Sequence, residues 1–179
     1  TISCSKDKVK KSVINEKNLD AQVFEAYQKG MDSLEAGDVL FAAKKFNEAE
    51  ILFPQSEWAP KSALMAAYSY YTQDYYKDAI AELERFIRIY PYYKDLDYAY
   101  YLMAISHYEQ IVDEKKDLQS IVNAKINFSL IIKDYPNTEY ALDAEFKLDL
   151  INDILASKEM YLGRYYLQKK KMDSSKQQI

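Results

Sequence analysis

Apolar residues recur at spacings of three and four along most of the chain, which is the period of an amphipathic α-helix. The first apolar stripe comprises Val23, Phe24, Tyr27, Met31 and Leu34. Gly37 breaks this stripe, and a returning stripe from Val39 to Phe53 stops before Pro54. A proline displaces the preceding residue from helical backbone angles, so the second helix should end there. The pattern predicts two antiparallel helices joined by a short turn.

The same arrangement occurs three times. Each copy has a small residue in the first helix and a second small residue that opens the next helix. In that second helix, apolar residues stand four and seven positions after the second small residue, and a proline closes the copy. The copies are Gly30, Ala42, Phe46, Ala49 and Pro54; Ala66, Ala79, Leu83, Phe86 and Pro91; and Ala104, Ala124, Phe128, Ile131 and Pro136. This pattern is typical of the tetratricopeptide (TPR) repeat. It predicts an all-α, TPR-type helical-hairpin solenoid of about three and a half repeats.

The repeats are expected near residues 20–54, 60–91 and 97–136. Residues 1–19 are lysine-rich and lack periodicity, so they are expected to form a flexible tether. The charged segment 112–120 is expected to be a loop, and one long helix is expected over 138–171, followed by a divergent tail at 172–179. The apolar stripe of that helix has no partner in this chain, so we expect that the solenoid is truncated C-terminally and lacks a capping hairpin.

The charge and the composition of the chain argue against several classes of function. The net charge of −4 and the pI of about 5.2 argue against binding nucleic acid, which needs a basic face. His107 is the single histidine, and no cysteine stands near it to complete a metal site. Phosphate-binding loops and nucleophile motifs are absent from the sequence. We therefore expect neither enzymatic activity, nor a cofactor, nor a metal site.

The tyrosines indicate a binding surface. In TPR stacks the first helix of each hairpin lines the concave face, where an extended peptide can insert an aromatic ring while a lysine or arginine holds its carboxylate. The alternative is that some of these side chains pack between helices, because half of each helix in a solenoid is interior. The residues predicted to form the peptide groove are Tyr27, Met31, Tyr70, Tyr71, Tyr101, Ile105 and Tyr108.

The start of the chain, Thr1 to Ser5, is similar to the end of a bacterial lipobox, with an aliphatic and a small residue before Cys4. A lipobox implies an upstream signal peptide and acylation, for instance by palmitate, of Cys4. The alternative is an incidental cysteine in a disordered leader.

Lysines also cluster at 169–171, where they suit either an acidic partner or simply the solvated end of a helix.

Several stretches resemble the BamD (YfiO) family, the TPR lipoproteins of the bacterial β-barrel assembly machinery (BAM complex). They are residues 67–71 (AYSYY), 85–88 (RFIR), 97–101 (DYAYY), 135–141 (YPNTEYA) and 155–167 (LASKEMYLGRYYL). The last stretch is the most specific, because TPR geometry does not require those residues. The resemblance covers most of residues 20–170.

The resemblance implies a non-enzymatic scaffold and substrate receptor for outer-membrane protein folding and insertion. It implies a lipid anchor at Cys4, on the periplasmic face of the outer membrane of a Gram-negative bacterium. The implied partners are a BamA-type β-barrel protein with POTRA domains, other BAM lipoproteins and unfolded outer-membrane proteins. The residues that it suggests for partner docking are Arg85, Arg88, Arg164, Tyr165 and Tyr166.

Two other functions remain open on the residues alone. One is another periplasmic TPR adaptor lipoprotein, acting in pilus assembly or cell-division coordination. The other is a TPR-linked enzyme whose catalytic domain lies outside these residues.

Overall fold

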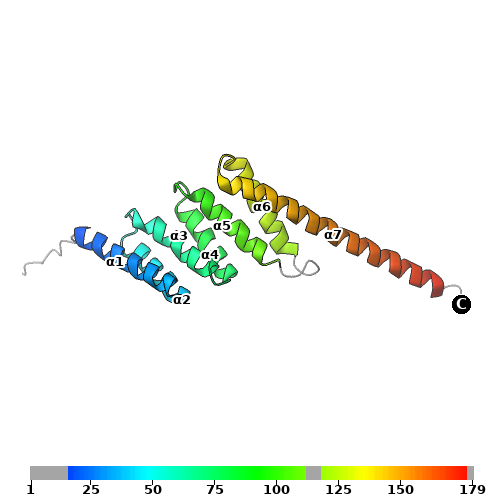
Figure 1. Ribbon diagram of the computed structural model, residues 1–179, viewed down its shortest axis with the longest axis horizontal. Coiled ribbons are helices and arrows are strands. Elements are labelled where there is room, and N and C mark those ends of the chain that lie inside the picture. The colour runs from blue at the N-terminus through cyan, green and yellow to red at the C-terminus, as the bar shows by residue number, and fades with distance from the viewer. Residues whose placement is uncertain (1–15, 112–117, 177–179) are drawn as a thin grey trace, which may run out of the picture.

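The computed structural model describes residues 16–111 and 118–176, and these residues form seven α-helices and no strand (Figure 1). The helices are α1 (Glu16–Glu35), α2 (Val39–Leu52), α3 (Trp58–Tyr71), α4 (Tyr76–Ile89), α5 (Leu96–Glu109), α6 (Leu118–Asp134) and α7 (Glu139–Lys176). The hairpins stack side by side along the long axis of the molecule, and α7 projects well beyond the stack. This is the predicted all-α solenoid.

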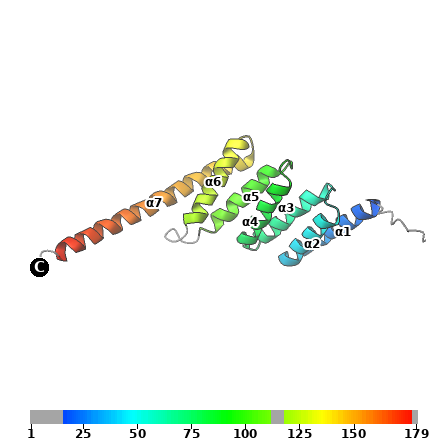
Figure 2. The same cartoon turned by 180° about the vertical axis from the view of Figure 1, so that it is seen from behind.

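Helices with odd and even numbers have different neighbours. Each helix packs on the next one in the chain, and α1, α3, α5 and α7 also touch one another in turn. The even-numbered helices α2, α4 and α6 have no such backbone proximity to each other within the described residues. Figure 2 shows the same order from behind. The odd-numbered helices therefore form one continuous layer, which can carry a binding surface across several repeats.

Local chemistry sets the helix boundaries. Gly37 adopts a φ of +81°, a left-handed backbone conformation that costs glycine little, and this ends the first helix of the first hairpin. Asp38 then caps α2, because its carboxylate Oδ1 accepts a hydrogen bond from the Phe41 N–H at 3.2 Å. At the start of α7 the Thr138 hydroxyl accepts from the Ala141 N–H at 3.2 Å in the same way.

One aromatic side chain fills the centre of each repeat. Phe46, Phe86 and Phe128 are all fully buried, and each lies in a separate core cluster. Gly30 makes room for the first of them: a Cβ at Gly30 would lie 2.7 Å from Cε1 of Phe46. The small residue thus permits the close approach of α1 and α2 that the repeat pattern predicts.

The boundaries differ from the expected ones at both ends of the solenoid. The first helix begins at Glu16, about one turn inside the stretch predicted to be a tether. A lysine-rich composition does not by itself prevent a helix, so the helix can extend by one turn into that stretch. The last helix continues to Lys176, into the predicted divergent tail. Most of the expected 112–120 loop and Cys4 lie outside the described residues, and α6 already begins at Leu118.

Candidate peptide-binding surface

Tyrosines of α3, α5 and α7 meet on the layer of odd-numbered helices. The rings of Tyr101 and Tyr140 stack with centroids 5.0 Å apart, and the Tyr98 ring lies 5.6 Å from Tyr140. Burial raises the pKa of Tyr98, and the neighbouring hydroxyls of Tyr68, Tyr140 and Tyr71 raise it further. Together these five side chains form what we call the tyrosine surface: Tyr68, Tyr71, Tyr98, Tyr101 and Tyr140. They come from three successive repeats, so a bound chain could run across all three.

A hydrogen bond between α5 and α7 fixes part of this surface. The Tyr101 hydroxyl donates to Asp143 Oδ2 at 2.7 Å, which joins α5 to α7. Burial, followed by this hydrogen bond, raises the pKa of Tyr101. The Tyr101 ring, stacked on Tyr140, and the Tyr101 hydroxyl are therefore held in place before any ligand arrives, which lowers the conformational entropy that binding would cost.

Two other predicted groove residues lie beside the tyrosine surface. Tyr108 packs with its ring centroid 6.3 Å from Phe128, and the Lys147 ammonium lies 4.9 Å from the Tyr108 ring centroid. Ile105 is half-buried and contacts both the second and the third core cluster. The predicted residues Tyr71, Tyr101, Ile105 and Tyr108 are thus brought into one region of α3 and α5.

Tyr27, Met31 and Tyr70 are placed differently. Tyr27 is only 8% exposed, because Phe46 and Trp58 cover its ring at centroid distances of 5.3 and 5.0 Å. Met31 is partly buried against the same first core cluster. Tyr70 lines a hollow beside α2, on the side of the even-numbered helices. Among these three, Tyr27 serves core packing, the alternative that the sequence left open.

Two adjoining hollows lie where α3 and α5 begin. The first has a volume of about 540 Å³ and is lined by Glu57, Trp58, Pro60, Lys61, Tyr93 and Lys94. The second, of about 360 Å³, shares three of these residues and extends to Tyr98 and Tyr140 of the tyrosine surface. The hollows therefore continue the tyrosine surface toward the first repeat.

The sequence pattern did not assign the residues of these hollows to a binding site. Tyr98 and Tyr140 lie in two of the stretches that resemble the family, 97–101 and 135–141, whereas Lys61, Tyr93 and Lys94 lie in none of them. A usable signal was present, because each closing proline is followed within seven residues by an aromatic residue: Trp58, then Tyr93 and Tyr98, then Tyr140. These positions lie in the first turn of the odd-numbered helices or, for Tyr93, in the turn just before one, and stacking the repeats brings them together.

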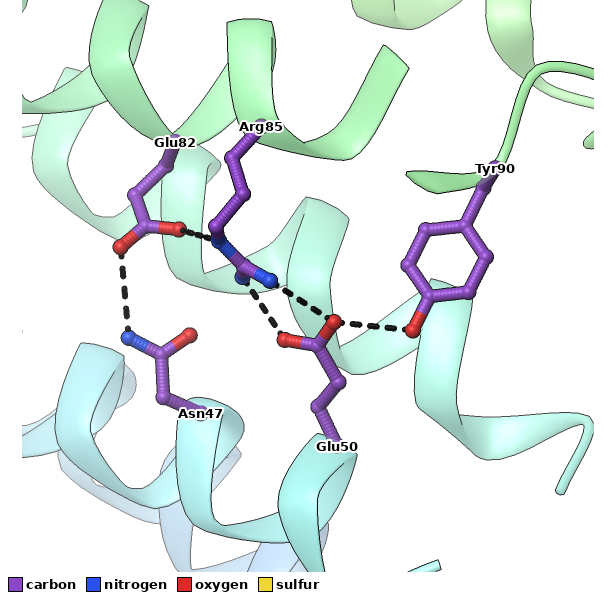
Figure 3. A network of polar contacts seen from close by, with 5 residues as sticks. All are labelled: Asn47, Glu50, Glu82, Arg85 and Tyr90. Carbon is purple, nitrogen blue, oxygen red and sulfur yellow. Dashed lines mark hydrogen bonds and ion pairs between the residues drawn. The ribbon is translucent and has the colours of Figure 1, made fainter. Parts of the chain in front are cut away.

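Arg85 is engaged within the chain, as Figure 3 shows. Its guanidinium donates from Nη1 and Nη2 to the two carboxylate oxygens of Glu50 at 2.9 and 2.7 Å, and from Nε to Glu82 at 2.9 Å. The Tyr90 hydroxyl donates to Glu50 at 2.8 Å, and Asn47 reaches Glu82 at 3.5 Å. The hydrogen bonds to Glu50 raise the pKa of Arg85. This network joins α2 to α4, whose backbones do not touch, so the structure gives Arg85 a role between repeats. Its predicted docking role stays a prediction.

The other predicted docking residues are exposed. Arg88 lies in the last turn of α4. Tyr165 and Tyr166 are 52% and 65% exposed on the distal half of α7, next to the exposed Arg164. Their accessibility fits a docking surface, and their role in docking stays a prediction.

Within the described residues, no group of three or more histidine, cysteine, aspartate or glutamate side chains is placed to hold a metal ion. His107 is half-buried in α5, and burial lowers the pKa of its imidazole.

None of the described helices combines the length and apolar character needed to cross a membrane.

Stacked helical hairpins with an aromatic layer define the class of this protein as a TPR-type solenoid. Two solved structures share the fold. The first TPR of Spaghetti (RPAP3), solved with the HSP90 peptide SRMEEVD, superposes with a TM-score of 0.57 at 16% identity, over 76% of this chain and 94% of that one. The TPR domain of Arabidopsis OM64 gives a TM-score of 0.56 at 16% identity, over 74% and 97% of the two chains. At this identity the likeness shows the fold alone.

The chain belongs to the YfiO family of outer membrane lipoproteins, which matches residues 19–174. Its relatives include the outer membrane protein assembly factor BamD of Caulobacter vibrioides, 43% identical over 141 residues, which cover 79% of this chain and 46% of the relative. BamD of Rickettsia prowazekii is 38% identical over 160 residues, covering 89% and 64% of the two chains. BamD of Neisseria gonorrhoeae is 30% identical, covering 84% and 60%. The chain thus spans about half to two thirds of the length of these relatives.

Proposed function

We propose that this chain acts in outer-membrane protein assembly as a scaffold and receptor that binds an extended polypeptide. Family membership supports the assembly role, because the relatives are named assembly factors. The observation that carries the receptor role is the tyrosine surface, which presents partly exposed, pre-positioned rings from three successive repeats. Aromatic side chains of this kind dominate binding energy at peptide interfaces.

The proposed partners are those that such a factor requires. They are a BamA-type β-barrel protein with POTRA domains, other lipoproteins of the complex, and unfolded outer-membrane proteins as clients. The exposed Arg88, Arg164, Tyr165 and Tyr166 are proposed for partner docking. Acylation of Cys4 is proposed to hold the protein on the periplasmic face of the outer membrane. The proposed function is binding without catalysis.

A peptide-binding measurement tests the receptor role. The probe is a fluorescent synthetic peptide of alternating apolar and polar residues that ends in phenylalanine. Replacing Tyr98 and Tyr101 by leucine, which keeps an apolar side chain, should weaken binding about tenfold, as expected when aromatic hot spots are lost. Tyr92→Leu is the matched control, because Tyr92 is 96% exposed and lies outside the tyrosine surface. Equal affinity of the double variant and the control would refute the receptor role.

Two further experiments test the location and the partners. Tagged protein with its native leader should co-purify from membranes with a large β-barrel protein that carries POTRA domains. Cys4→Ala should release the protein from the membrane when it is expressed without those partners. Persistent membrane binding of this variant would contradict the lipid anchor while leaving the assembly role intact.

A further inference from the structure

The joint between the first and second repeats differs in chemistry from the joint that follows it. The network around Arg85 bridges the first joint by linking α2 to α4 (Figure 3). Counted back from the closing prolines, the positions of Glu50 and Arg85 correspond to Ile87 and Leu130 at the second joint, between α4 and α6. Isoleucine and leucine side chains carry neither a charge nor a hydrogen-bonding group. The polar bridge therefore has no counterpart at the matched positions of the second joint.

The bridge crosses a hollow and not a packed core. Among the described residues the backbones of α2 and α4 do not come close to each other, whereas α2 packs along α3. A hollow of about 460 Å³ lies on the side of α2 and α4. The residues that line it are Asn47, Glu50, Ile51, Pro54, Glu82, Arg85, Ile89 and Tyr90. The contact of α2 with α3 can thus act as a pivot, and the hydrogen bonds across the hollow limit rotation about it.

These hydrogen bonds allow a narrow range of angles. The Arg85 guanidinium donates to both carboxylate oxygens of Glu50, at 2.9 and 2.7 Å, and the Tyr90 hydroxyl donates to the same carboxylate at 2.8 Å. A two-point guanidinium–carboxylate pair has a fixed planar geometry, so rotating one hairpin weakens both bonds together. The Glu50 side chain is 9% exposed, and a buried carboxylate without its cation is strongly destabilising. Apolar contacts, in contrast, are non-directional and tolerate sliding.

We propose that Glu50 and Arg85 act as a latch that sets the angle between the first two repeats and thereby positions Trp58. On the opposite side of the same joint, the Trp58 ring of α3 lies against two rings of α1, with centroid distances of 5.3 Å to Phe24 and 5.0 Å to Tyr27. A change of angle at the latch moves α1 relative to α3 and alters these contacts.

The latch also affects the proposed binding surface, and this step rests on the proposed function. Trp58 forms a wall of the first hollow, which continues the tyrosine surface toward the first repeat. Arg85 lines the hollow on the side of the even-numbered helices instead. Arg85 is thus a positioning residue, which acts on peptide binding through Trp58 and does not contact the peptide.

Distances between paired spin labels on neighbouring helices test the latch. Lys44→Cys with Glu84→Cys spans α2 and α4, and Glu84→Cys with Ser129→Cys spans α4 and α6 as the control joint. All three positions are exposed, so the labels should not disturb the core. Cys4→Ser in every sample removes the single native cysteine. Double electron–electron resonance gives the distribution of each distance.

The expected result is a change confined to the first joint. In Arg85→Met the α2–α4 distribution should broaden by about 2 Å, the usual scale of helix shifts at an interface, and the α4–α6 distribution should stay as in the wild type. Emission from Trp58, the single tryptophan, should shift to the red because looser contact with α1 admits water. Affinity for the fluorescent peptide that ends in phenylalanine should fall about fivefold.

Two further variants calibrate these measurements. Arg85→Lys keeps the charge but cannot form the two-point pair, so it should give smaller changes of the same kind. Lys77→Met is the matched control, because it removes a charge from an exposed position of the same helix, and it should leave distances, emission and affinity unchanged. If Arg85→Met does not fold, Arg85→Lys and Tyr90→Phe, which removes one donor to Glu50, are judged by the same measurements.

The outcomes separate this inference from the proposed function. An unchanged α2–α4 distribution, or equal broadening at both joints, would overturn the latch. Broadening at the first joint with unchanged Trp58 emission or unchanged peptide affinity would overturn the positioning role. If the wild type binds no peptide, the receptor role falls, and the distances and the Trp58 emission decide the latch: changes confined to the first joint support it, and their absence overturns it.

Discussion

Replacing Gly30 by alanine tests the packing that sets the spacing between α1 and α2. The new methyl group would lie 2.7, 2.8 and 3.0 Å from Cε1, Cδ1 and Cζ of Phe46. Ordinary contacts between carbon atoms are about 3.5–4.0 Å. Phe46 is fully buried, so its ring cannot swing into solvent to relieve the clash. The two helices must instead move apart, and that movement disturbs the whole first core cluster.

The size of the effect follows from two opposing terms. Overpacking a well-filled core costs about 1–3 kcal/mol. Alanine in place of glycine inside a helix recovers about 1 kcal/mol of helix propensity. Because the contacts are far below the ordinary distance, the overpacking cost should lie in the upper part of its range. We expect Gly30→Ala to lower the free energy of unfolding by about 1–2 kcal/mol.

Urea titration followed by circular dichroism measures this change. Gly163→Ala in α7 is the matched control, because a Cβ there meets nothing within 4 Å, and it should raise helix content or stability by up to about 1 kcal/mol. Phe46→Leu supplies a second test: in that background Gly30→Ala should cost less, since the clashing ring is gone. A Gly30→Ala protein at least as stable as the wild type would refute the reasoning.

Three other substitutions probe single contacts. Arg85→Met should destabilise the protein by about 2 kcal/mol in urea titration, because it leaves the mostly buried Glu50 carboxylate without its cation. The control Arg88→Met, at an exposed position, should change stability by less than about 0.5 kcal/mol. Equal effects of the two substitutions would contradict a role for Arg85 between repeats. Tyr101→Phe should cost about 1 kcal/mol through the lost hydrogen bond to α7 yet keep peptide affinity, since the ring remains; a large affinity loss would show that the hydroxyl itself binds. Burial lowers the pKa of His107 from 6.5, so the unfolded chain binds a proton more readily than the folded protein, and stability should fall as the pH drops below 6.5. His107→Gln should weaken this pH dependence of stability. Identical pH profiles of the variant and the wild type would rule out the imidazole as the source of the dependence.

The tyrosine surface illustrates how far spacing alone predicts a site. Tyr71, Tyr101 and Tyr108 were selected because the first helix of each repeat should face the ligand, and they lie in one region. Tyr27 was selected by the same rule, yet Trp58 from the next repeat covers its ring. The register of Tyr27 within its helix is right, but its exposure depends on a residue thirty-one positions later in the chain, which the periodicity of a single helix does not describe.

Arg85 shows the same limit for charged residues. Its place in a stretch that resembles the family suggested docking, whereas the structure pairs it with Glu50, 35 residues away. Ion pairs between repeats require two long side chains to meet across helices whose backbones do not touch. Sequence spacing cannot specify that meeting, because it depends on how successive hairpins are rotated.

The sequence by itself determined the helices, their pairing into hairpins and the solenoid, because each repeat closes with local signals: small residues where helices cross, an aromatic residue in the core, and a proline at the end. It also indicated the family. Only the tertiary structure decided which tyrosines remain accessible, that Lys61 and Lys94 share a pair of hollows, and that Arg85 joins two repeats. Local signals act within one hairpin, whereas a surface is made where neighbouring hairpins meet, and its composition depends on the rotation between them.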